Sequence, residues 1–474
     1  MHSFSSADDI LLVDNISVHI IDFAEDENFV FIATVCKPWR RSWGSRPAKT
    51  SPITTSTSVP QLEEAVKSDV SLYRLCSLSV TLGRTDLLQA SRNLGAPWIN
   101  AMSMAASLND LSLVKFMRRL GCPMSENAFE VFSYNGNLEA LNYLMQKGCP
   151  SGRCVEYAAS SENITTLRWL RDNGGVLTAR SFASACLTGN VEVIQWFERN
   201  DCAWDERALP YAARSGNIEA VELLVGLGFE LTSQATKAAA GLERMEILMW
   251  LRQNGCPWGK STCAQASRDG RLENLIWARA HGADWGPQVC AVAAKQGHFS
   301  ILKWAKENGC SWDSTTLRGA AEGGWVEILQ WAIQKECPGL EDTLVCASAA
   351  NGLHLGILKW LREEKGFAWD ASTMIYASEA GCFDVVEYCL VNECPTNSAV
   401  VAAAASANRF QMVKFLVSKG CPVDNQACEN AAGSGNVQML AYFKRMGCNV
   451  GIGCLRMARK NSQKEMIAWL KDQK

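Results

Sequence analysis

Apolar and polar positions along the chain recur in short blocks that have the period of an amphipathic helix. In the segment FSILKWAKENG, which begins at Phe299, the side chains of Phe299, Leu302 and Ala305 fall on one face at about 100° per residue. Trp304 widens this apolar stripe. The preceding block, CAVAAKQG, is alanine-rich and ends at Gly297. We therefore predict two short antiparallel helices joined by a tight turn at this glycine.

The same pair of blocks recurs along most of the chain. The segments SGNIEAVELLVGLGF, QGHFSILKWAKENGC and SGNVQMLAYFKRMGC share one frame. We call the bulky position near the end of each second block the anchor. The fifteen anchors, about 27 residues apart, are residues 90, 116, 143, 169, 196, 223, 250, 277, 304, 331, 360, 388, 415, 442 and 469.

Two columns of this repeat are nearly constant. Thirteen of the fifteen anchors are aromatic, and eight of these are tryptophan, with Ala90 and Leu223 as the exceptions. The position eleven residues before the anchor is alanine in thirteen repeats, with Ser79 and Phe132 as the exceptions. We expect the alanine column to let helices approach closely. The aromatic column is expected to fill the space between stacked pairs as core, and not to form a ladder for base stacking.

Each repeat is too short to be stable as an isolated helix pair. Nucleating a short helix is costly, and a single pair buries little area, so the repeats must stack on one another. We therefore predict an all-α fold, an elongated α-solenoid of about fifteen stacked helix-turn-helix repeats, with a small helical module at the N-terminus. Residues suited to cap the first helices of their repeats are Ser125, Asp205, Asp313, Asp370 and Asp424.

The second blocks resemble the second helix of ankyrin repeats. SGNIEAVELLVGLG, TGNVEVIQWFERN and NGNLEALNYLMQKG carry that signature, and the resemblance covers roughly residues 70–474. The spacing departs from the family, whose repeats have about 33 residues and enter the first helix through T-P-L-H. Here most repeats run from a turn similar to G-C-P-W, the sequence of residues 255–258, directly into that helix. The projecting fingers of the family should therefore be reduced to tight loops. The resemblance implies protein recognition along one concave surface, without catalysis.

The N-terminal residues lie outside the repeat and contain a second resemblance. The segment from residue 11 to 43 has an apolar helix, an acidic turn and a second helix that ends in V-C-K-x-W-R, and it resembles an F-box. Val13 and Asn15 depart from that pattern, which has a proline and an acid there. The positions that match are Leu12, Ile16, Ile20, Ile21, Phe23, Ile32, Val35, Cys36, Lys37, Trp39 and Arg40. The alternative is a plain three-helix cap on the solenoid.

These features divide the chain into three parts. Residues 1–43 form the F-box-like module, residues 44–60 a linker rich in Ser, Thr and Pro, and residues 61–474 the repeat solenoid. The F-box resemblance implies that the first part binds the Skp-type adaptor of a cullin ubiquitin ligase, while the solenoid holds the protein to be modified. The alternative is a non-catalytic scaffold without association with a ubiquitin ligase. In either case the chain is expected to act as a monomer within protein complexes.

Candidate contact residues follow from this division. The expected adaptor-binding residues are Leu12, Ile16, Ile20, Val35 and Trp39. In the solenoid, one position of the first helix varies between repeats while its neighbours are constant, which favours an exposed, partner-binding face. The residues at this position that we select are Glu130, Glu156, Lys237, Arg318 and Glu429.

Charge narrows the choice of partner. The formal net charge is −3, so no general basic field attracts nucleic acid or an anionic membrane. We therefore expect protein partners, no nucleic acid and no membrane. A local basic run, which reads either as a nuclear localisation signal or as a solvated helix end, comprises Lys37, Arg40, Arg41, Arg46 and Lys49. The start of the chain is acidic where a secretory signal would be basic, which favours the cytoplasm or the nucleus.

Twenty cysteines raise the question of a metal or redox site, most clearly in NGCPWGKSTC with Cys256 and Cys263. No C-x-x-C occurs, and none of the five histidines is three or four residues from another, so no zinc pattern is present. Cys256 belongs to a column six residues after the anchor that is cysteine in nine repeats. Members of this column should be too far apart to form disulfides along the stack. We interpret the motif as the joint of a repeat and expect no metal and no cofactor.

An enzyme is the third class of protein to consider. The sequence has no phosphate-binding glycine loop, no G-x-S-x-G motif and no paired histidines or carboxylates outside the repeat frame. We therefore expect no catalytic residues. Lys464 stands where the other repeats have an apolar residue, and this is typical of a terminal capping repeat.

Overall fold

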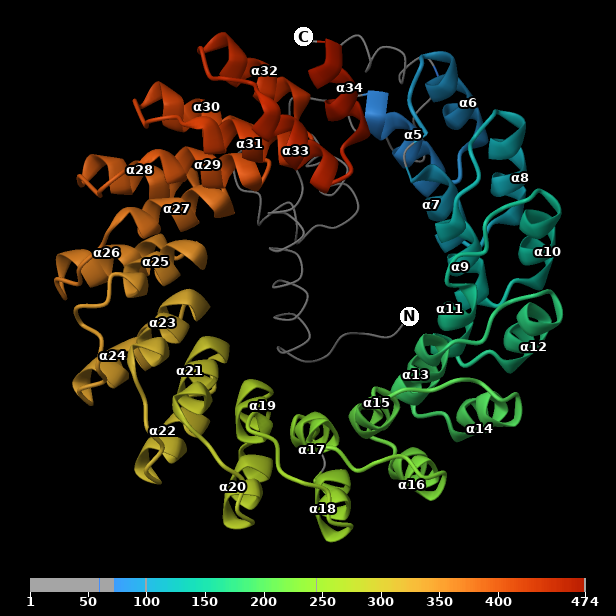
Figure 1. The fold of residues 1–474 in the computed structure, drawn as a ribbon, viewed down its shortest axis with the longest axis horizontal. Coiled ribbons are helices and arrows are strands. Elements are labelled where there is room, and N and C mark those ends of the chain that lie inside the picture. The colour runs from blue at the N-terminus through green and yellow to red at the C-terminus, as the bar shows by residue number, and fades with distance from the viewer. Residues whose placement is uncertain (1–58, 60–71, 99, 244, 473–474) are drawn as a thin grey trace. The chain divides into compact units, whose positions relative to one another are not determined.

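The computed structural model describes residue 59 and residues 72–98, 100–243 and 245–472. The chain divides into two compact units, the N-terminal unit (residues 1–215) and the C-terminal unit (residues 216–474). The described residues contain thirty α-helices, α5 to α34, which alternate as the first and second helices of successive pairs (Figure 1). The F-box-like module and most of the linker lie outside the described residues.

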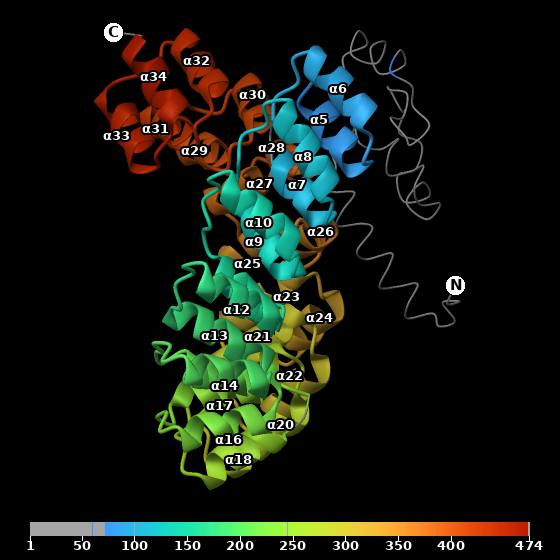
Figure 2. The ribbon, with the colours of Figure 1, turned by 90° about the vertical axis from the view of Figure 1, so that its right-hand side faces the viewer.

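The N-terminal unit holds the first eleven of these helices (Figure 2). They are α5 (Leu72–Thr81), α6 (Thr85–Asn93), α7 (Ala101–Ser107), α8 (Leu111–Arg119), α9 (Glu126–Asn135), α10 (Leu138–Gln146), α11 (Cys154–Ser160), α12 (Ile164–Asp172), α13 (Ala179–Thr188), α14 (Val191–Arg199) and α15 (Ala208–Ser215).

The C-terminal unit holds the other helices. They are α16 (Ile218–Gly226), α17 (Ser233–Ala240), α18 (Glu246–Gln253), α19 (Thr262–Arg268), α20 (Leu272–Ala280), α21 (Pro287–Gln296), α22 (Phe299–Glu307), α23 (Ser314–Gly323), α24 (Val326–Gln334), α25 (Leu344–Asn351), α26 (Leu355–Glu363), α27 (Ala371–Ala380), α28 (Phe383–Val391), α29 (Ser398–Ser406), α30 (Phe410–Ser418), α31 (Asn425–Gly433), α32 (Val437–Arg445), α33 (Ile452–Lys460) and α34 (Lys464–Asp472).

The helix pairs confirm the predicted helical solenoid. Each odd-numbered helix is the first helix of a repeat, and each of the fifteen anchors lies on an even-numbered second helix. Within each unit the first helices pack extensively against one another in one layer, and the second helices form another layer with few contacts between neighbours (Figure 1). Neighbouring repeats are therefore closely packed through their first helices and spread apart at their second helices.

The alanine column explains the tight side. Every alanine eleven residues before an anchor has no exposed surface, and the two exceptions, Ser79 and Phe132, are also fully buried. Glycine brings the helices closer still where α23 packs on α21. A Cβ atom at Gly319 would lie 2.4 Å from the carbonyl oxygen of Ala291, and one at Gly323 would lie 2.1 Å from that of Lys295. The expectation of close helix approach is confirmed.

The aromatic column is less buried than the sequence led us to expect. On α22 the side chains of Ile301 and Leu302 are 1% and 0% exposed, and Ala305 is 0% exposed, whereas the anchor Trp304 is only half-buried. Other anchor tryptophans are also half-buried, and Trp196, at 8% exposed, is the exception. The core of the second helices is therefore mainly aliphatic, with Phe197 on α14 and Phe443 on α32 as fully buried aromatic members. Because second helices are splayed apart, each anchor ring covers the core with one side and faces solvent with the other.

Turns and caps follow the sequence closely. Gly297 ends α21 with φ +79°, and Gly255 adopts φ +81° after α18, both in the left-handed region that favours glycine. The carboxylates of Asp313 and Asp370 accept hydrogen bonds from backbone N–H groups at the starts of α23 and α27. Asp424 caps α31 in the same way. Ser125 occupies the N-cap position of α9 without a side-chain cap bond, and Asp205 accepts from the backbone and side chain of Arg207 before α15.

In several repeats the residue before the second helix either caps that helix or bonds to the preceding repeat. Where it is asparagine, it caps its own helix, as when Asn190 accepts from the N–H of Val193 on α14. Where it is larger, it reaches back to the end of the preceding first helix. The indole N–H of Trp325 donates to the carbonyl of Lys295 at 3.0 Å, and a ring nitrogen of His298 lies 3.0 Å from the carbonyl oxygen of Arg268. These bonds use helix-end carbonyls that have no partner within their own helix.

None of the helices in the described ranges has both the length and the apolar character that a membrane span requires.

Candidate functional site

The candidate partner-binding face is placed on five first helices, and its members differ in exposure. Glu130, on α9, is buried at 4% exposed, so the expectation of an exposed position is wrong there. Its carboxylate accepts the backbone N–H of Arg153 at 2.9 Å and forms an ion pair with the guanidinium at 3.4 Å. The reason is tertiary, because the chain that enters α11 passes over α9 and its Gly152 lies against the Glu130 carboxylate.

Two other members of this position also pair with the following repeat. The guanidinium of Arg318, on α23, is 2.5 Å from a carboxylate oxygen of Asp342. Burial opposes ionisation of Asp342, but hydrogen bonds from Ser314 and Arg318 outweigh it and hold the pKa of this carboxyl below its usual range. Glu429, on α31, lies 3.8 Å from the guanidinium of Arg456. The position therefore links neighbouring repeats as well as facing solvent.

The remaining members, Glu156 on α11 and Lys237 on α17, are half-buried. Each of the five residues lies on a different first helix, so they form one register position and not one cluster. The expected adaptor-binding residues lie outside the described residues, and their role stays a prediction. These are Leu12, Ile16, Ile20, Val35 and Trp39.

The cysteine motif at residues 254–263 has a structural role inside its own repeat. The thiol of Cys256 donates to the carbonyl of Thr232, the N-cap residue of α17, at 3.2 Å. This bond ties the end of the second helix to the start of the first. The equivalent bond, in each case to a carbonyl 24 positions earlier in the sequence, is made by Cys149, Cys202, Cys310, Cys337 and Cys394. The interpretation of the motif as the joint of a repeat is confirmed.

These thiols are poor nucleophiles because of their burial. Burial raises the pKa of both Cys256 and Cys263 to about 11, so the thiolate is rare at neutral pH. The nineteen cysteines of the described residues are free thiols. No group of three or more metal-ligating side chains occurs in the described part of the chain.

Tryptophans that follow the cysteines connect one repeat to the next. The ring of Trp258 meets the next anchor, Trp277, edge to face with centroids 5.9 Å apart, and the guanidinium of Arg252 lies 4.6 Å from the Trp258 ring. Trp312, which follows Cys310, repeats the contact with the anchor Trp331 at 5.6 Å. Cations held over aromatic faces are attracted by the ring quadrupole. Trp258 therefore covers the joint between its own repeat and the next one.

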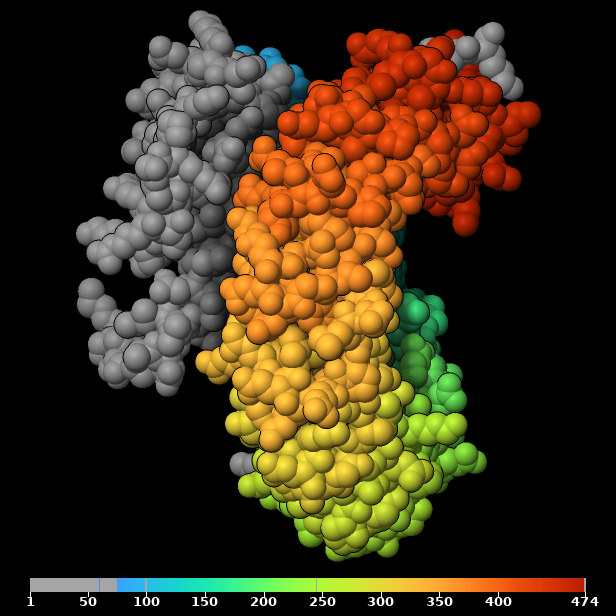
Figure 3. All heavy atoms as spheres, turned by 90° about the vertical axis from the view of Figure 1, so that its left-hand side faces the viewer, coloured from blue at the N-terminus to red at the C-terminus, as the bar shows by residue number. Residues whose placement is uncertain are grey.

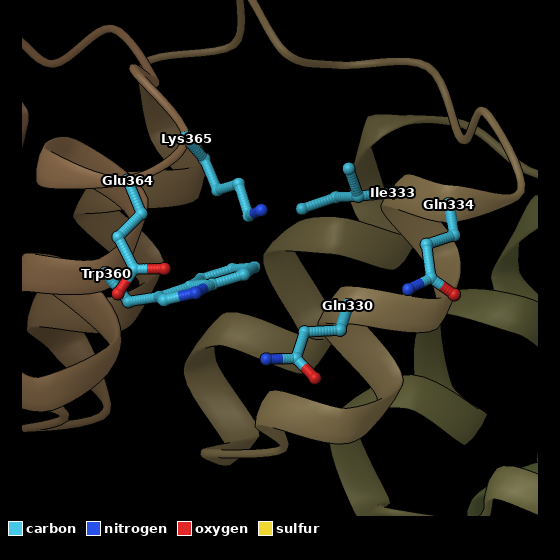
Figure 4. Close-up of a pocket in the computed structure, with 6 residues that line it drawn as sticks. All are labelled: Gln330, Ile333, Gln334, Trp360, Glu364 and Lys365. Atoms are coloured by element: carbon cyan, nitrogen blue, oxygen red, sulfur yellow. The ribbon is translucent and has the colours of Figure 1, made fainter.

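Between neighbouring second helices of the C-terminal unit the surface is grooved. One groove, of about 280 Å³, lies between α24 and α26. In Figure 4, Trp360 projects from α26 toward α24, with Lys365 beside it and Gln330 on the facing helix. The ammonium group of Lys365 is 5.2 Å from the Trp360 ring centroid. Such a half-open ring beside amide and charged groups offers both an apolar contact and hydrogen bonds to a ligand.

Two further grooves in this unit have different linings. One of about 450 Å³ lies between α30 and α32 and contains Phe410, Lys414 and Arg445. Another of about 380 Å³ follows the turns beside α22 and α24 and contains Phe299 and Trp325. The grooves lined by Trp360 and Tyr442 were not predicted, because these anchor aromatics were assigned to the core. The sequence did contain a signal for such grooves. On the second helices, positions beside the aliphatic residues carry charged side chains in some repeats and amides in others.

Comparisons with protein-family models and with curated proteins give no match to this chain.

Proposed function

We propose that this protein is a non-catalytic receptor for other proteins, in which the repeats hold a target and the N-terminal segment recruits a Skp-type adaptor of a cullin ubiquitin ligase. Ubiquitin transfer would be carried out by other subunits, and the contribution of this chain would be effective concentration. Tethering a target near the conjugating enzyme turns a rare encounter into an intramolecular one.

One observation supports the receptor role most directly. Grooves that repeat the same framework carry different chemistry: Gln330 and Gln334 face Trp360 in one, whereas Lys414 and Arg445 flank Tyr442 in another. The core beneath each groove is apolar. A stack of equivalent supports with different surface groups is suited to reading an extended protein ligand, because each repeat contributes its own contacts.

The adaptor half of the proposal rests on the F-box-like pattern of the sequence. Its test is affinity purification of the full chain, of residues 61–474, and of a full-length variant carrying Leu12→Ala, Ile16→Ala and Ile20→Ala. We expect Skp-type and cullin subunits to co-purify with the unaltered full chain, and not with residues 61–474 or with the triple variant. The matched control is Glu156→Ala with Lys237→Ala in the full chain, which should keep the adaptor.

The outcomes separate the two halves of the proposal. If the adaptor is absent from every sample while target proteins are retained by residues 61–474, the protein is a scaffold without ligase association. If neither adaptor nor any specific protein co-purifies with the full chain, the receptor role itself is wrong.

A further inference from the structure

The groove between α30 and α32 has a lining unlike that of the groove between α24 and α26. Its apolar part consists of Phe410, Val437 and Tyr442, all half-buried, and the rings of Phe410 and Tyr442 meet with centroids 5.8 Å apart. The groove belongs to the second-helix layer of the C-terminal unit, and α30 lies on the side of Figure 1 that is turned to the viewer in Figure 3. It is a shallow hollow with an aromatic floor.

Two exposed cations border this floor, and the lining contains no carboxylate. They are Lys414, whose ammonium group is 4.3 Å from the Phe410 ring centroid, and Arg445 at the end of α32. Neither residue forms a salt bridge with the described residues. In the groove of α24 and α26, by contrast, Glu364 lies among the lining residues together with Lys365.

The sequence around the groove is positively charged, as is the groove lining itself. Residues 409–472 contain ten Lys and Arg against four Asp and Glu, although the whole chain carries a net charge of −3. A local positive field over an apolar floor is complementary to a ligand with carboxylates around an apolar side chain. Nucleic acid is a poorer match, because only two cations line this groove, whereas a nucleic-acid site neutralises a run of phosphates.

We infer that the groove between α30 and α32 binds an acidic peptide segment of a partner protein. Carboxylates of the peptide pair with Lys414 and Arg445, and one apolar side chain between them rests on Phe410 and Tyr442. This inference rests on the proposed function as a protein receptor and names the class of segment that one of its grooves recognises.

The test uses the purified full-length protein and fluorescein-labelled heptapeptides in which Glu and Asp alternate around a central Leu or Phe. Matched peptides carry Gln and Asn in place of the acids. Fluorescence anisotropy should show binding of the acidic peptides only, with affinity that falls as salt is raised. The double variant Lys414→Glu and Arg445→Glu should weaken binding by roughly tenfold or more, since it replaces two attractions with two repulsions.

A charge-matched control separates local recognition from the general field. The control is the double variant Lys460→Glu and Lys471→Glu, at exposed positions on α33 and α34. It should alter the affinity by less than about twofold because both residues lie outside the groove lining. Phe410→Ala should weaken binding severalfold while leaving the salt dependence unchanged. Circular dichroism of each variant checks that its helices are intact.

The inference is overturned if acidic and amide peptides bind equally, if no acidic peptide binds, or if Lys460→Glu with Lys471→Glu weakens binding as much as Lys414→Glu with Arg445→Glu. Binding of a single-stranded oligonucleotide in place of the peptides would also overturn it and would assign the groove to nucleic acid. The measurement needs no adaptor, so a failure of adaptor co-purification would leave a positive peptide result intact.

Discussion

A methyl group added to a glycine would clash with a neighbouring helix in the first-helix layer but would meet open space in the second-helix layer. On the first helix α23, a Cβ atom at Gly319 would lie 2.4 Å from the backbone of α21, whereas on the second helix α26, a Cβ atom at Gly356 would meet nothing within 4 Å. Both glycines are helical and belong to the same kind of repeat. The difference shows that first helices hold the stack together through backbone contact, while second helices leave space beside their aromatic rings.

This division separates stability from recognition. The first layer relies mainly on small residues, because a larger side chain at a position such as Gly319 would push neighbouring repeats apart. The second layer can exchange Gln, Lys, Arg or Glu around a half-buried ring without disturbing the apolar core beneath it. Substitutions that contrast buried with open positions therefore test the division directly.

The largest effect is expected within α22, where a fully buried and a half-buried residue are two positions apart. Leu302→Ala should lower the free energy of unfolding by about 3 to 5 kcal/mol, because it leaves a cavity between the helices. Trp304→Ala should cost only about 1 to 2 kcal/mol, because part of its ring already faces solvent. Urea unfolding followed by circular dichroism measures both, and an equal or larger loss for Trp304→Ala would place the anchor ring in the core after all.

The next effect compares the two glycines. Gly319→Ala should destabilise the protein by about 1 to 3 kcal/mol, because α21 and α23 must separate to admit the methyl group. Gly356→Ala should be neutral or stabilising by up to about 1 kcal/mol, since alanine favours the helix and the space is open. Thermal melts of the two variants check this pair, and a stabilised Gly319→Ala protein would contradict the close approach of the first helices.

Alkaline pH should weaken the joint that contains Cys256. Burial raises the pKa of Cys256 from its ordinary value of 9.0 to about 11. Above pH 9 the unfolded chain therefore releases its thiol proton before the folded chain does, so the free energy of unfolding falls as pH rises from about 9 to 11. Melting temperatures should be level from pH 7 to 8 and fall above that window. Cys256→Ser should reduce the slope, and an unchanged slope would show that Cys256 does not contribute.

The smallest effects are expected at the variable position of the first helices. Glu130→Ala should cost about 1 kcal/mol, because it leaves the backbone N–H of Arg153 without its buried acceptor. Arg456→Ala should change stability by less than about 0.5 kcal/mol, since its side chain is 74% exposed and its pair with Glu429 is 3.8 Å long. Denaturant midpoints distinguish the two, and equal losses would mean that burial does not set the strength of these pairs.

Much of the fold could be predicted because its signals are local. Gly297 and Gly255 mark turns by their need for positive φ, Asp313 and Asp370 mark helix starts, and the alanine column follows from spacing alone. The candidate site was harder to predict. Glu130 looked variable and therefore exposed, but the Arg153 that buries it belongs to the next repeat. A sequence column records which face a residue is on, not how closely the next repeat covers that face.

The sequence by itself determined the period, the fifteen helix pairs, their turns and the small residues at which first helices meet. Each of these depends on the conformation of a few neighbouring residues or on a spacing that repeats along the chain. Only the tertiary structure decided that the second helices are splayed, that anchor rings such as Trp360 and Tyr442 stay half-buried, and that Trp325 reaches back to the preceding repeat. These features depend on distances between residues about 30 positions apart, and such distances follow from the packing of whole helices against one another.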